Sequence, residues 1–284
     1  MTKPPDQFPR TADLPTQSPQ FWVAQKDRYL RQILIRDIEA LTKRRLIVYF
    51  SNRFAGAQID HGDCALINEL LGTGPDEPTD LVLETNGGFT DAVEGVIALL
   101  QNRISDLRLI VTHAAKSNGT VLGLAAKSIV MGAQSELGPI EPHLMGIPCS
   151  IISEARIEKE NFVFHMNGKF ALQQTKSLAE RLLREGMFKG KPEPEIQALV
   201  HKLASRDAYF SHGSVIDHRE AAALGLKIEY LAHDDPVWQR LWLLHCMFEY
   251  DCNKNGLLKV FEGRALSTAL SIPPPAPPSP APAP

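Results

Sequence analysis

The chain has 284 residues, of which 44% are hydrophobic and 22% are charged, fractions typical of a globular protein. They exclude a disordered chain, a collagen and a coiled coil as descriptions of the whole protein. The chain has 30 basic and 33 acidic side chains, which give a net charge of −3. The broad basic surface of a nucleic-acid-binding protein is therefore not expected.

Cysteine spacing and hydropathy indicate the cellular setting. The four cysteines form no C-x-x-C pair and have no histidine at zinc-ligand spacing, which favours a reducing compartment and no metal site. No apolar signal segment and no run of about 18 apolar residues is found. We therefore expect a cytoplasmic protein without a transmembrane segment, and peripheral contact with a membrane stays open.

In chain order, five segments are predicted. They are a disordered N-terminus (1–18), an N-terminal helix (19–43), an α/β domain (44–233), a C-terminal helical segment (234–271) and a disordered proline-rich tail (272–284). Apolar residues of the N-terminal helix recur at spacings of three and four: Leu30, Ile33, Leu34, Ile38 and Leu41. This stripe must dock either on the chain's own core or on another subunit.

The α/β domain alternates short apolar runs with helical patterns. Strands are predicted at residues 46–51, 80–85, 107–113, 128–132 and 226–231, and helices at 59–72, 90–103, 117–126, 170–186, 192–206 and 218–224, with a further helix at 235–248 in the next segment. Such alternation predicts a mostly parallel sheet flanked by helices. Functional groups are then expected where the strands end.

Two turns at predicted strand ends carry the candidate chemistry. Ser117 lies in A-K-S-N-G-T, where a strand-to-helix turn exposes the serine hydroxyl as in a nucleophile elbow; an ordinary helix N-cap is the alternative. Gly87 and Gly88 end T-N-G-G, where backbone amides can bind a developing oxyanion; a plain connecting turn is the alternative.

Taken together with IVMGAQSELGPIEPHL and YFSHGSVIDHREAAALGL, these motifs resemble the serine dehydrogenase proteinases. That family shares its fold with Clp protease, signal peptide peptidase A and the crotonases, and the resemblance covers about residues 44–232. It implies a serine endopeptidase of the Clp/crotonase fold, with Ser117 as nucleophile, Gly87 and Gly88 as oxyanion donors, and no cofactor. This chain departs from the usual family motifs at Asn86, Asn118, Glu141 and His143.

The resemblance leaves the general base open between two residues. Lysine-using relatives place the base 40 to 50 residues after the serine near the start of a helix, which points to Lys169, with Lys159 as the next candidate. Partial burial at a helix start would lower the pKa of such a lysine toward the working pH. Histidine-using Clp protease places it about 25 residues after the serine, which points to His143. A serine without a functional base is the third alternative.

The resemblance also bears on partners and on rival functions. It implies a protein or peptide substrate and a homo-oligomer, because relatives of this fold form closed rings. A crotonase-like acyl-CoA hydratase or isomerase would use the paired amides without Ser117. A catalytically inactive scaffold of the same fold would use neither.

Overall fold

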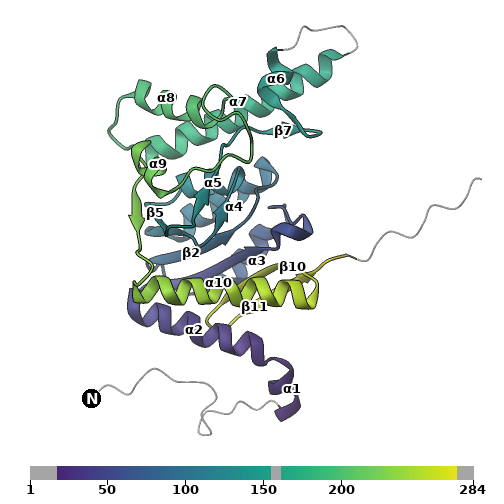
Figure 1. Cartoon of the computed structure of the whole chain (residues 1–284), viewed down its shortest axis with the longest axis vertical. Coiled ribbons are helices and arrows are strands. Elements are labelled where there is room, and N and C mark those ends of the chain that lie inside the picture. The colour runs from purple at the N-terminus through teal and green to yellow at the C-terminus, as the bar shows by residue number, and fades with distance from the viewer. Residues whose placement is uncertain (1–17, 155–160, 274–284) are drawn as a thin grey trace, which may run out of the picture.

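A computed structural model describes residues 18–154 and 161–273 of the chain (Figure 1). The predictions of disorder at both ends fall mostly on residues 1–17 and 274–284, which lie outside the described residues, as does Lys159. The N-terminal helix is broken at Gln25 into α1 (Pro19–Ala24) and α2 (Lys26–Thr42). None of the described helices is long and apolar enough to cross a membrane.

A seven-stranded sheet forms the centre of the molecule, in the order β11-β10-β1-β2-β3-β5-β9. Its parallel strands are β1 (Arg45–Ser51), β2 (Thr79–Glu84), β3 (Leu107–Val111), β5 (Ser128–Met131) and β9 (Ile228–Tyr230). The predicted mostly parallel α/β architecture is therefore confirmed. Two antiparallel strands, β10 (Leu257–Gly263) and β11 (Ser267–Ser271), extend one edge.

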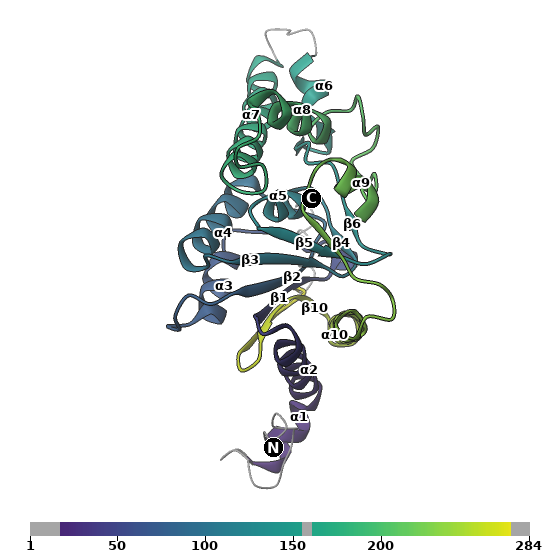
Figure 2. The same cartoon turned by 90° about the vertical axis from the view of Figure 1, so that its left-hand side faces the viewer.

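Helices cover both faces of this sheet, as Figure 2 shows. On one face lie α3 (Asp63–Leu71), α4 (Thr90–Arg103) and α5 (Asn118–Leu124), with α7 (Phe162–Glu185) and α8 (Glu193–Leu203) beyond α5. On the other lie α2 and α10 (Pro236–Asn255). The remaining elements are short: the 3-10 turn Arg53–Ala55, β4 (Ala114–Ala115), β6 (Glu136–Leu137), β7 (His143–Leu144), β8 (Ile147–Pro148), α6 (Cys149–Glu154) and α9 (His218–Ala223).

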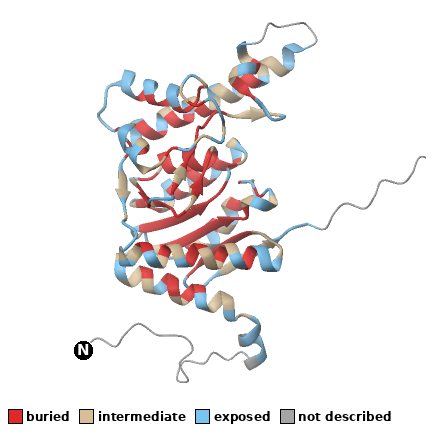
Figure 3. Ribbon diagram, viewed as in Figure 1, coloured by how far each residue is buried: buried red, intermediate tan, exposed pale blue. Residues whose placement is uncertain are grey.

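The central strands are buried on both faces, which explains their continuous apolar sequences (Figure 3). In β1, Ile47 and Tyr49 belong to the core under α3 to α5, whereas Leu46, Val48 and Phe50 belong to the core under α2 and α10. Successive side chains alternate between the two cores because strand residues point to opposite faces. The sheet thus holds the carboxyl ends of β2 and β3 rigidly side by side.

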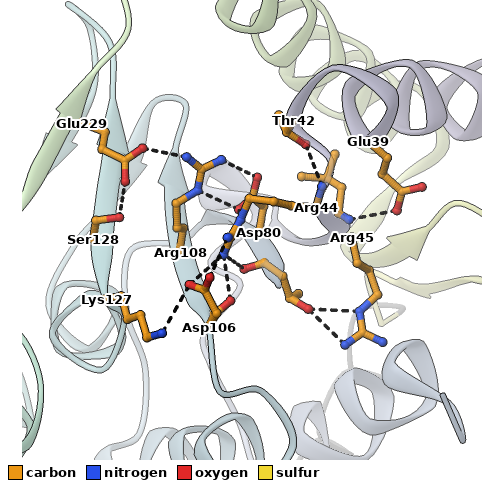
Figure 4. A network of polar contacts seen from close by, with 12 residues as sticks. Glu39, Thr42, Arg44, Arg45, Asp80, Asp106, Arg108, Lys127, Ser128 and Glu229 are labelled. Atoms are coloured by element: carbon orange, nitrogen blue, oxygen red, sulfur yellow. Dashed lines mark hydrogen bonds and ion pairs between the residues drawn. The ribbon is translucent and has the colours of Figure 1, made fainter. Parts of the chain in front are cut away.

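Charged side chains join neighbouring strands near the amino ends of β2 and β3 (Figure 4). Asp80 on β2 is fully buried and accepts hydrogen bonds from Arg44 at 2.5 Å and from Arg108 on β3 at 2.8 and 2.9 Å. Arg108 also pairs with Glu229 on β9 at 2.6 Å. Because Asp80 and Arg108 are direct cross-strand partners, these pairs fix the register of the parallel strands.

The C-terminal segment differs from the prediction. Residues 236–255 form the expected helix, but residues 257–271 form the β10–β11 hairpin instead of continuing it. Lys259 on β10 is fully buried, and its Nζ lies 2.6 Å from Asp60 and 2.9 Å from Asp63. These carboxylates are more than 190 residues away in sequence, so the local pattern could not reveal the partners that make a buried lysine acceptable in a strand.

The apolar stripe of the N-terminal helix docks largely on the chain's own core. Leu34 and Ile38 are buried in the core under α2 and α10, while Leu30 and Leu41 are about half exposed. Arg31 adds a buried ion-pair cluster: it donates to both oxygens of Glu262 at 3.0 and 2.8 Å and also pairs with Asp251. The helix therefore belongs to the fold of the single chain, and its predicted role in assembly stays a prediction.

This cluster yields a test of how α2 is held. We expect Arg31→Ala to lower the free energy of unfolding by about 3 to 5 kcal/mol, because it leaves the fully buried Glu262 carboxylate without its cation. The control is Lys26→Ala, an exposed change on the same helix, which should stay within about 0.5 kcal/mol of wild type. Urea unfolding followed by circular dichroism measures both; equal stabilities for the two variants would contradict the proposed anchoring.

Candidate active site

A cavity of about 450 Å³ opens above the carboxyl ends of β2 and β3. Its volume is typical of a ligand-binding pocket, and it lies where parallel α/β folds place their ligands. The structure brings four of the sequence-predicted site residues to this cavity: Ser117, Gly87, Gly88 and His143. The fifth, Lys169, is not among its lining residues.

Ser117 occupies an unusual backbone conformation at the start of α5. Its φ of 53° and ψ of −121° lie in a region that non-glycine residues rarely adopt. Its side chain makes no capping hydrogen bond to the helix, which disfavours the ordinary N-cap interpretation. The strained turn instead places Ser117 at the wall of the cavity, where its Oγ has no hydrogen-bond partner within residues 18–154 and 161–273, as a nucleophile elbow requires.

The glycine turn after β2 approaches two other segments so closely that neither glycine tolerates a side chain. A Cβ at Gly87, where φ is 107°, would lie 2.7 Å from the Cβ of Ser117. A Cβ at Gly88 would lie 2.2 Å from the carbonyl oxygen of Ile59. Backbone hydrogen bonds to Ile59 at 2.8 and 3.0 Å hold the turn in this place. The absence of side chains at these glycines thus allows the turn to contact the serine turn.

The orientation of the amides differs from the expected pair. The Gly87 amide donates to Thr85 Oγ1 at 3.0 Å and is already engaged. The amides of Gly88 and of Asn118 have no hydrogen-bond acceptor among the residues that the structure describes, and both residues line the cavity. The Asn118 amide was not predicted from the sequence, although its position directly after Ser117 was an available signal.

Three histidines line the cavity with Ser117: His61, His143 and His212. His143 is half-buried on β7, and its ring packs edge-on against His212 with centroids 4.2 Å apart. Burial lowers the pKa of His143 below its ordinary value and lowers that of His212 to about 4. Both imidazoles are therefore neutral near pH 7, the form that can accept a proton.

Lys169 lies on the wrong side of its helix to meet these groups. Helix α7 begins at Phe162, so Lys169 sits two turns inside it and its side chain is exposed. The α7 residues that line the cavity are Ala171, Gln174 and Thr175. Lys169 precedes Ala171 by two positions, which is a rotation of about 200° around a helix. The structure therefore does not bring Lys169 to Ser117 within this chain.

A buried polar cluster lies at the end of β2, next to the glycine turn. Within the described part of the chain, Glu84, His113 and His245 form the one group of metal-type ligands, with ligand atoms within 4.8 Å of one another. Arg53 lies among them, 2.6 Å from Glu84 and 2.9 Å from His113, so a side-chain cation already pairs with the carboxylate. Burial raises the pKa of Glu84 to about 8 and lowers that of His245 to about 4.

Comparison with known proteins places this geometry in context. A family model described as ClpP-like SDH-type serine proteinase matches residues 53–243. One uncharacterized protein of Methanocaldococcus jannaschii is 27% identical over 171 residues, covering 58% of each chain. Another from the same organism is 29% identical over 119 residues, covering 40% of this chain and 41% of the relative. The matched region thus spans less than two thirds of either relative.

A solved structure also aligns with the chain. A ClpP1 mutant from Listeria monocytogenes gives a TM-score of 0.47 at 15% identity, covering 73% of this chain and 99% of that one. The family model is the firmer finding, because it spans well over half of the chain and includes both turns and the three histidines of the cavity. The chain belongs to the ClpP-like SDH-type serine proteinase family.

Proposed function

We propose that this chain is a serine endopeptidase that cleaves polypeptides through an acyl-enzyme on Ser117. The observation that supports this most directly is the meeting of a strained, uncapped serine with the two unpaired amides of Gly88 and Asn118 at one cavity. Acyl transfer needs a nucleophile and oxyanion donors that are already in place before the substrate binds. Family membership agrees with this assignment.

In the proposed reaction, Ser117 Oγ attacks the carbonyl carbon of the scissile peptide while its proton passes to the base. The amides of Gly88 and Asn118 hydrogen-bond the oxyanion of the tetrahedral intermediate. The base then gives the proton to the leaving amine as the C–N bond breaks. Water, activated by the same base, hydrolyses the acyl-enzyme and restores Ser117.

We assign the base to His143 in preference to Lys169. The supporting observations are that His143 lines the cavity and that burial lowers its pKa, so the imidazole is neutral and basic near pH 7. The exposed position of Lys169 offers no comparable support.

We further expect a homo-oligomer, because two helices expose apolar side chains to solvent. These side chains are Leu30 and Leu41 on α2, and Phe162 and Phe170 on α7.

The nucleophile can be tested by covalent labelling. A fluorophosphonate should add one adduct to the wild-type chain, and peptide mapping should place it on Ser117. Ser117→Ala should abolish the adduct, whereas Ser177→Ala, which changes an exposed serine on α7, should label as wild type does. Labelling that survives in Ser117→Ala would refute the assignment.

The base can be tested by the rate and the pH dependence of the same labelling. We expect His143→Ala to lower the acylation rate by about 10² to 10⁴, and Lys169→Ala to leave it within a few-fold. Because burial lowers the pKa of His143, the wild-type rate should fall only as pH drops below about 6.5 and stay level above pH 7. A rate that keeps rising at alkaline pH, with the opposite ranking of variants, would return the role to Lys169.

A further inference from the structure

We infer that the side chain of Asn118 is a positioning residue that clamps the two oxyanion donors in register, an inference that rests on the proposed function. The side chain of Asn118 is buried where it meets the glycine turn. Its Nδ2 donates to the carbonyl oxygen of Gly88 at 2.7 Å and to Thr90 Oγ1 at 3.2 Å.

The geometry ties together the two residues that supply the free amides. Asn118 supplies one amide from its own backbone and holds Gly88, which supplies the other, through its side chain. The tie crosses from the start of α5 to the turn before α4, segments 30 residues apart in sequence. It therefore fixes the spacing of the two donors, a quantity that neither turn can fix by itself.

The glycine turn needs such a tie. Two consecutive glycines have wide conformational freedom, and Gly87 adopts a positive φ of 107°. On its far side the turn is held by the backbone of Ile59, which accepts from the Phe89 amide at 3.0 Å. On the side that faces Ser117, the Asn118 side chain donates a hydrogen bond to the Gly88 carbonyl oxygen. This bond restricts rotation of the Gly88 backbone. Preorganised donors stabilise a transition state because they need no rearrangement when charge develops.

The test uses Asn118→Ala and the isosteric Asn118→Asp in the full-length chain. Asp cannot donate to the Gly88 carbonyl and sets a negative charge beside the oxyanion. We expect kcat for a peptide substrate to fall by about tenfold to a hundredfold in the Ala variant and further in the Asp variant, with KM within about threefold of wild type. A peptide boronate, which forms a tetrahedral adduct on serine, should lose affinity in proportion to kcat.

A second readout is independent of activity. Amide hydrogen exchange, measured by mass spectrometry on the substrate-free protein, should accelerate by about threefold to tenfold in peptides that contain Phe89, the change expected from losing one hydrogen bond. The control is Gly95→Ala on α4, whose new methyl group meets no atom within 4 Å; its exchange at Phe89 and its kcat should match wild type.

The outcomes separate the clamp from the proposed function. A wild-type protein that neither labels nor cleaves peptides refutes the peptidase assignment, and the exchange rates then decide the clamp alone. An active wild type whose Asn118 variants keep kcat, or keep the exchange rate at Phe89, overturns the clamp and leaves the peptidase assignment standing. Variants that bind the substrate weakly but turn it over at the wild-type kcat also overturn it, because that pattern marks ground-state binding.

Discussion

The close approach of three backbone segments is the constraint on which the candidate site depends. Gly87 lies against Ser117 and Gly88 lies against Ile59, each too near for any side chain. A side chain at Gly87 would clash with Ser117, and one at Gly88 would clash with the backbone of Ile59, so either would push the glycine turn out of its place. Lys259 secures the other side of this contact, because its ion pairs with the half-exposed Asp60 and the buried Asp63 fix the segment directly after Ile59. The β10–β11 hairpin therefore supports the site although it contributes no residue to the cavity.

Buried charge sets the position of the two turns relative to the sheet. Glu84, the last residue of β2, accepts a hydrogen bond from the Ala114 amide at 3.0 Å and pairs with Arg53 at 2.6 Å. These contacts join the end of β2 to β4 and to the 3-10 turn after β1, just before the glycine and serine turns begin. Burial of a carboxylate is costly, and its elevated pKa of about 8 reflects that cost. Its retention at this point favours a structural role in aligning the turns.

The arrangement of α7 explains why the two candidate bases differ so clearly in the structure. A helix that begins at Phe162 presents Ala171, Gln174 and Thr175 to the cavity as one stripe with spacings of three and four. Lys169 lies outside that stripe, while His143 reaches the cavity from β7, on a different segment. The packing of α7 in the folded chain decides which of its faces lines the cavity, and Lys169 lies on the opposite face.

The sequence alone determined the parallel α/β architecture and the place of the candidate site. Apolar runs that stay buried on both faces identified the strands, and Ser117 with the glycine pair followed the ends of two of them. Tertiary structure alone decided the β10–β11 hairpin and the docking of α2 through Arg31 and Glu262. It also decided that the amides of Gly88 and Asn118 lie at the same cavity. Strand and turn patterns are local and can be read within a few residues. A buried ion pair or a meeting of two amides joins residues tens to hundreds of positions apart, so it exists only once the chain has folded.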